Sequence, residues 1–91
     1  MKIAKGFVLS EVPGKDGEYI VLGVGEASSK LNGFLTLNET GVFIWKLLEN
    51  GATETEIVDA FLKEYDAPRD IIESDVKNTI NVLNGIGAID D

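Results

Sequence analysis

The sequence predicts a single α+β domain of winged helix-turn-helix-like architecture, with an N-terminal three-stranded antiparallel sheet followed by three helices. Strand-compatible runs separated by turn residues occupy the first 38 residues, and helix-cap signals with apolar residues three or four apart occupy the rest. A chain of 91 residues has room for one small core. We expect one domain over 1–91, with the sheet over about 3–37 and helices over about 39–49, 54–65 and 70–84.

The predicted sheet is an antiparallel meander of three strands. The strand-like runs are FVLSEV (7–12), YIVLGV (19–24) and FLTL (34–37). The connections PGKDGE (13–18) and GEASSKLNG (25–33) are rich in the Gly, Pro, Asn and Asp residues that favour turns. The last strand is short and pairs with its predecessor on one side, so its other side is predicted to be an open edge.

Each predicted helix begins with a recognisable cap pattern. Asn38 is a favourable N-cap for the first helix. Thr53 and Glu56 form a T-x-x-E capping box at the start of the second. Asp70 and Glu73 repeat this spacing as D-x-x-E before the third. These patterns place all three helix starts without reference to tertiary contacts.

Apolar residues at helical spacing give each helix one face for the core. Trp45 on the first helix is predicted to be a core anchor rather than a stacking platform, because a Trp buries a large area. On the third helix the apolar face is formed by Ile72, Val76, Ile80 and Leu83. The C-terminal segment GAID is expected to form a short extension.

Composition excludes most enzyme chemistry. The sequence contains no cysteine and no histidine, which removes thiolate nucleophiles, disulfides, the usual general base and the commonest metal ligands. The clustered carboxylates fall in the first turns of predicted helices, where they cap N–H groups and favour the helix dipole. No apolar run is long enough to span a membrane. We therefore expect a cytoplasmic, non-catalytic protein without cofactor or metal.

The net charge of −8 is confined to the second part of the chain. Residues 1–38 carry four basic and four acidic side chains, whereas residues 39–91 carry four basic side chains against twelve acidic ones. Nucleic-acid binding depends on Lys and Arg displacing the counterions of phosphates. The helical part is therefore a poor candidate for DNA binding.

The strand 34–37 and the third helix together suggest a binding surface. An open strand edge offers main-chain N–H and C=O groups to an extended peptide. If the third helix lies along this edge, Val76, Thr79, Ile80 and Leu83 would form the wall of an apolar groove. The alternative is that these four residues pack on the first helix, and several of them are expected to do so.

The sequence from the last strand onward resembles the PqqD family. The family's Leu-Asn-Glu-Thr/Val-Gly, Ile-Trp-x-Leu-Leu and Gly-x-Thr-x-x-Glu-Ile elements are matched by residues 37–41, 44–48 and 51–57. Its later Asp-Val and Leu-x-x-x-Gly elements are matched by Asp75-Val76 and by residues 83–87. The resemblance is in register over about residues 31–89, and the first 30 residues fit by strand layout alone.

The resemblance implies a peptide chaperone in the biosynthesis of ribosomally made, modified peptides. Members of the family bind the leader segment of a precursor peptide and present it to a modifying enzyme, often a radical SAM enzyme or a leader peptidase. In the family the leader adds as an antiparallel strand to the third strand and packs against the third helix. Asn38 and Gly41 are interpreted as structural. Carried over to this sequence, the predicted peptide-binding residues are Phe34, Leu35, Thr36, Leu37, Val76, Thr79, Ile80 and Leu83.

Two other functions are compatible with parts of the sequence. A winged-helix DNA-binding regulator shares the predicted architecture, but its recognition helix would carry Glu73 and Asp75. A small enzyme would need a nucleophile and a base, and no such pair can be identified. The sequence leaves open which precursor peptide and enzyme are the partners, and whether the domain is a monomer or an edge-strand dimer.

Overall fold

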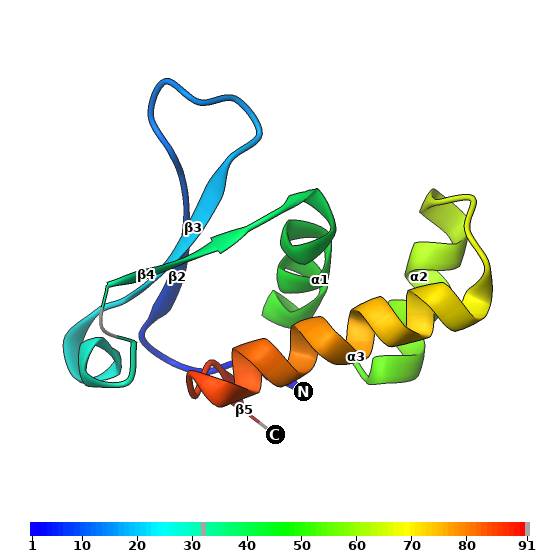
Figure 1. The fold of residues 1–91 in the computed structure, drawn as a ribbon. Coiled ribbons are helices and arrows are strands. Elements are labelled where there is room, and N and C mark those ends of the chain that lie inside the picture. The colour runs from blue at the N-terminus through cyan, green and yellow to red at the C-terminus, as the bar shows by residue number, and fades with distance from the viewer. Residues whose placement is uncertain (32, 91) are drawn as a thin grey trace.

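The computed structural model of the protein describes residues 1–31 and 33–90 (Figure 1). Three strands form an antiparallel sheet in the order β2-β3-β4, and three helices follow the sheet in the chain, which confirms the predicted α+β fold class. The strands are β2 (Phe7–Glu11), β3 (Tyr19–Gly23) and β4 (Phe34–Leu37), and the helices are α1 (Glu39–Glu49), α2 (Glu54–Glu64) and α3 (Arg69–Gly85).

Two features were not anticipated from the sequence. A 3-10 helix, η1 (Gly25–Ser29), occupies much of the predicted turn between β3 and β4. Strand β1 (Lys2–Ile3) pairs antiparallel with β5 (Ile89–Asp90), which lies in the expected C-terminal extension. The short ladder formed by β1 and β5 brings the two ends of the chain together (Figure 1).

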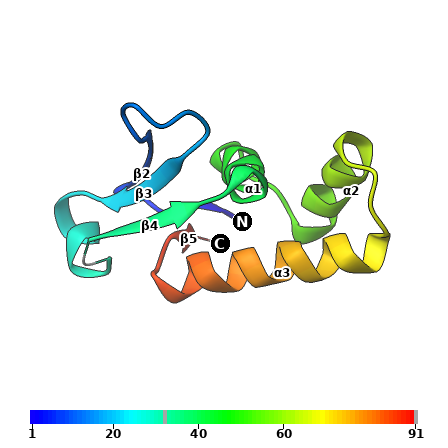
Figure 2. The same cartoon turned by 45° about the horizontal axis from the view of Figure 1, so that its top comes forward.

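The pairing of β4 leaves one of its edges open. β4 pairs with β3 from Tyr19 opposite Leu37 to Leu22 opposite Phe34. Among residues 1–31 and 33–90, no strand pairs with the other side of β4. In Figure 2, α3 runs beside this open edge, while α1 continues from the end of β4. The sheet therefore has an unpaired edge next to a helix, as the sequence predicts.

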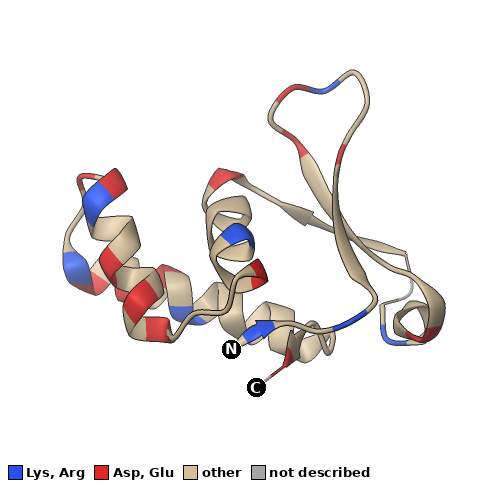
Figure 3. Cartoon of the chain, turned by 180° about the vertical axis from the view of Figure 1, so that it is seen from behind, with Lys and Arg blue, Asp and Glu red and all other residues tan. Residues whose placement is uncertain are grey.

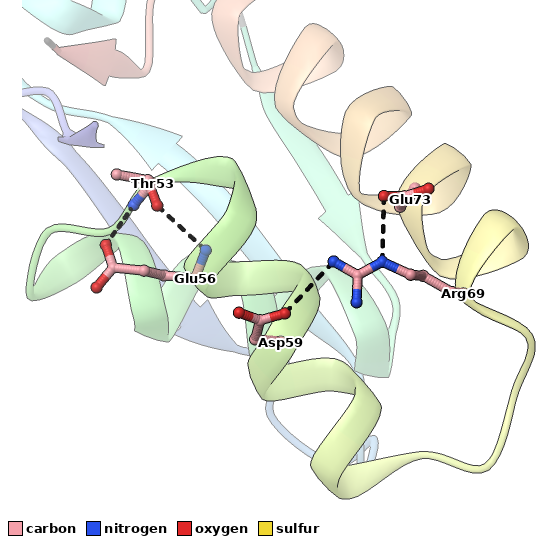
Figure 4. Close-up of polar contacts among 5 residues, drawn as sticks. All are labelled: Thr53, Glu56, Asp59, Arg69 and Glu73. Atoms are coloured by element: carbon pink, nitrogen blue, oxygen red, sulfur yellow. Dashed lines mark hydrogen bonds and ion pairs between the residues drawn. The ribbon is translucent and has the colours of Figure 1, made fainter.

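The first two helix caps have the predicted geometry. The Asn38 side chain accepts a hydrogen bond from the backbone N–H of Gly41 at 2.8 Å. At α2 the backbone N–H of Thr53 donates to Glu56 Oε1 at 2.9 Å, and the backbone N–H of Glu56 donates to Thr53 Oγ1 at 3.1 Å (Figure 4). The hydrogen bond from the Thr53 backbone is the main reason that the pKa of Glu56 is lowered.

The predicted capping box of the third helix is wrong. Pro68 is the N-cap, no side chain caps this end, and Asp70 lies inside the first turn. Pro68 has an extended backbone (φ −60°, ψ 141°) and the helix begins at Arg69, two residues earlier than an Asp70 cap would allow. Glu73 instead accepts from Arg69 Nε at 3.4 Å, and Arg69 Nη2 also reaches Asp59 Oδ1 on α2 at 3.5 Å (Figure 4). These ion pairs are more than half exposed, so their contribution to stability is small.

The core centres on α1. Trp45 is 1% exposed, and Ile44 and Leu48 are completely buried, which confirms Trp45 as a core residue. α1 lies between the sheet and α2, and α3 passes beneath it (Figure 2). Val76 and Leu83 are fully buried, so α3 packs against the core along most of its length.

The capping box of α2 gives a first testable prediction. We expect Thr53→Ala to lower the free energy of unfolding by about 1 kcal/mol, because the N–H of Glu56 loses its acceptor. Urea unfolding followed by the fluorescence of the single tryptophan, Trp45, would measure this loss. Thr55→Ala is the control, because Thr55 is exposed on the same helix and its change should stay within about 0.5 kcal/mol. Equal losses in the two variants would contradict the capping-box interpretation.

Candidate functional site

A groove of about 370 Å³ lies between β4 and the C-terminal half of α3. Its position is the one that the open edge of β4 and the adjacent helix suggest. One wall comes from β4 and the start of α1, and the other from α3. The lining residues are Leu35, Thr36, Leu37, Asn38, Gly41, Asn78, Thr79, Val82 and Leu83.

The strand wall combines side chains with main-chain groups. Leu37 is buried and Leu35 is half-buried, whereas Phe34 and Thr36 are exposed, as expected for side chains that alternate across a sheet. In an antiparallel ladder, alternate residues direct their N–H and C=O groups away from the paired strand. Two of the four residues of β4 therefore present main-chain donors and acceptors on the open edge.

The helix wall contains both buried and exposed apolar surface. Leu83 is completely buried and contributes to the floor, whereas Val82 is 51% exposed at the rim. Asn78 and Thr79 continue this wall one turn earlier on α3. The outer side of α3 is otherwise mostly polar. The half-exposed Val82 therefore offers apolar surface to a partner.

The structure separates the four α3 residues predicted for the groove. Thr79 and Leu83 line it, but Val76 and Ile80 do not. Val76 is fully buried and Ile80 is half-buried against the core, which is the alternative arrangement considered from the sequence. The apolar periodicity of α3 marks the side that faces the core, so it could not single out Val82, which lies beside Leu83 at the rim.

Gly41 and Asn38 close one end of the groove. A Cβ atom at Gly41 would lie 3.2 Å from Leu37 Cδ2 and 3.3 Å from Asn38 Oδ1. A larger residue would therefore crowd both the strand end and the helix cap. Both residues have the structural roles expected from the sequence, but sequence reasoning missed that they also line the groove.

The groove lining carries no charged side chain, although the protein is acidic. Figure 3 shows Asp and Glu most densely gathered over α2 and the adjoining end of α3. A second cleft of about 270 Å³ between these helices is polar and contains Arg69, which is engaged with Asp59 and Glu73. An acidic helical surface of this kind disfavours contact with nucleic-acid phosphates.

Within the described parts of the chain, no three His, Cys, Asp or Glu side chains lie close enough together to hold a metal ion. None of the helices there combines the length and apolar character needed to cross a membrane. The groove instead combines main-chain hydrogen-bonding groups with apolar surface. These are the two components with which a strand edge binds an extended peptide.

Comparisons with known proteins bear on the family and the fold of this chain. Residues 18–89 match the family described as Coenzyme PQQ synthesis protein D (PqqD). A solved structure of TbiB1 in complex with the TbiA(beta) leader peptide is 29% identical, covers 100% of both chains and has a TM-score of 0.76. A lasso peptide synthetase B1 complexed with the leader peptide has a TM-score of 0.72 at 18% identity, covers 96% of this chain and 93% of its own, and supports the fold alone. A search of the curated proteins found no match.

The family match extends from the end of the first turn to β5, so it includes the groove and all three helices. It also reaches further toward the N-terminus than the resemblance detected from the sequence, which began near residue 31. The family resemblance is confirmed: the chain belongs to the PqqD family.

Proposed function

We propose that this protein is a non-catalytic peptide chaperone that binds the leader segment of a ribosomally synthesised precursor peptide. The observation that carries the proposal is the open edge of β4 beside an uncharged, partly apolar groove. Membership of the PqqD family supports it. The similar structure of TbiB1, which is in complex with the TbiA(beta) leader peptide, supports it further.

In the proposed binding mode, the leader adds to β4 as an antiparallel strand. Main-chain groups of Phe34–Leu37 pair with the leader, and alternate leader side chains enter the groove. Thr79, Val82 and Leu83 contact these side chains. Val76 and Ile80, which pack inward, support the groove wall from the core side.

We further propose that the bound leader is delivered to a modifying enzyme, either a radical SAM enzyme or a leader peptidase. Family membership supports this step. Binding at β4 leaves the hairpin of β2 and β3 on the opposite side of the sheet available for an enzyme. A second copy of the chain pairing through β4 would occupy the same edge, so such a dimer would compete with the leader.

Two apolar residues of α3 that are about equally exposed, Val82 and Ile71, allow a matched test of the groove. We expect Val82→Glu to weaken leader binding by roughly tenfold or more, because the bound peptide would bury an unpaired carboxylate. Ile71→Glu is the control, because Ile71 is 53% exposed on the same helix, against 51% for Val82, and lies outside the groove. Both substitutions add the same charge at a surface position, so both variants should stay folded.

The measurement is fluorescence anisotropy of the labelled leader segment from the precursor peptide encoded beside the gene. Circular dichroism would verify the fold of both variants. Equal effects of Val82→Glu and Ile71→Glu would rule out the groove as the binding surface. Failure of this leader to bind the unaltered protein would count against the proposed function itself.

Strand addition predicts a distinctive pattern of amide hydrogen exchange. Only alternate residues of β4 direct their N–H groups outward, so leader binding should slow exchange at two alternate positions, either Phe34 and Thr36 or Leu35 and Leu37. NMR-detected exchange with and without the same leader would show this pattern. Tight binding without slowed exchange on β4 would contradict strand addition while leaving leader binding intact.

A further inference from the structure

We propose that Asn38 has a second function besides capping α1: its side-chain NH₂ group donates a hydrogen bond to a main-chain carbonyl of the bound leader. The contact would lie at the end of β4, where regular pairing between the leader and the strand must stop. This inference rests on the proposed function and adds a positioning residue to the same groove. It follows from the orientation of the Asn38 amide, its place in the groove and the end of the β4 main chain.

The orientation of the amide is fixed by its role as a cap. The atom that faces the backbone N–H of Gly41 at 2.8 Å must be the oxygen, because that N–H can only donate. Thr40 Oγ1 contacts the same oxygen at 2.9 Å. The Nδ2 atom is therefore the end of the side chain that faces away from this cap. Within residues 1–31 and 33–90, the hydrogen bonds of the Asn38 side chain all involve its oxygen, and its Nδ2 atom donates none.

The position of Asn38 brings this donor to the groove. Asn38 is exposed, follows the last residue of β4 directly and lines the groove together with Leu37 and Gly41. No Lys or Arg belongs to the lining. The other polar side chains of the lining are those of Thr36, Asn78 and Thr79, none of which is held in place by a cap. Asn38 is thus the donor in the groove whose orientation is already fixed before a ligand arrives.

The end of β4 explains why a side-chain donor is needed beside Asn38. The carbonyl of Asn38 accepts from the backbone N–H of Val42 at 3.0 Å, so it belongs to α1 and is not available to a strand partner. β4 ends at Leu37, so a leader strand that continues past this residue has no regular main-chain partner opposite it, and its next carbonyl needs another donor. A carbonyl left without a donor in a desolvated contact is costly. The Nδ2 group of Asn38 supplies a donor for one leader carbonyl at the point where the chain changes from strand to helix.

Asn38→Ser and Asn38→Asp separate the two functions of this residue. Both replacements keep an oxygen that can accept from the Gly41 N–H, and Ser, Asp and Asn are about equally favourable as N-caps. Both remove the amide donor, and Asp also places a negative charge beside the leader carbonyl. We expect leader affinity to fall about threefold to tenfold in Asn38→Ser and further in Asn38→Asp, with little change in urea unfolding.

Asn78→Asp is the matched control for charge, because it adds a carboxylate to the opposite wall of the same groove. It should weaken binding less than Asn38→Asp. The probe is the leader segment of the precursor peptide encoded beside the gene, measured against the whole chain. Folded Asn38→Ser and Asn38→Asp variants that bind this leader as tightly as the unaltered protein would overturn the inference.

A second measurement does not depend on how the variants fold. In the unaltered ¹⁵N-labelled protein, the side-chain NH₂ resonances of Asn38 should shift and exchange more slowly when the leader is added. Unchanged Asn38 side-chain resonances at saturation would also overturn the inference, while leader binding itself would stand. If the leader does not bind the unaltered protein at all, the proposed function fails and this inference fails with it.

Discussion

The junction between β4 and α1 determines the geometry on which the rest of the site depends. Leu37 anchors the strand end in the core, and Asn38 caps the helix that begins one residue later. Gly41 allows the first turn of α1 to approach the strand, because a Cβ atom there would press on both neighbours. This close junction stops the strand abruptly. It leaves the open edge of β4 and the start of α1 on the same side of the groove.

The opposite wall depends on how the C-terminal end of α3 is held. The Ala88 N–H donates to the Leu83 carbonyl at 2.9 Å and ends the helix, and the Ala4 N–H donates to the Ala88 carbonyl at 2.7 Å. β1 and β5 then pair beside this point. The N-terminal segment therefore fixes the end of α3 that carries Val82 and Leu83. The width of the groove thus depends on residues about 80 positions away in the chain from its helix wall.

Charge is segregated from the groove by the arrangement of the helices. The acidic side chains are most densely gathered on α2 and the adjoining part of α3, whereas the lining of the groove is uncharged (Figure 3). In the proposed binding mode, an uncharged lining would let main-chain hydrogen bonds and apolar contacts dominate, because no buried charge would have to be desolvated. The acidic surface contributes to solubility and disfavours nucleic acid without entering the site itself.

The sequence by itself determined the fold class, the first two helix starts and the family. These follow from local signals, namely caps, turns and apolar periodicity, which act over a few residues. It also located the open edge of β4 and two residues of α3 that line the groove, Thr79 and Leu83. It misplaced the start of α3, because Pro68 and not Asp70 is the N-cap of that helix.

Only the tertiary structure decided which residues of α3 and of the β4–α1 junction face the groove. Apolar periodicity reports burial, so it grouped Val76 and Ile80 with Leu83 although both pack toward the core. It could not reveal that the exposed Val82 and the polar Asn38 and Asn78 share one lining, because their proximity depends on how α3 crosses the end of β4. The ladder of β1 and β5 could not be predicted from the sequence, because strands of two residues carry no local signal. Such strands form only when the fold brings the chain ends together.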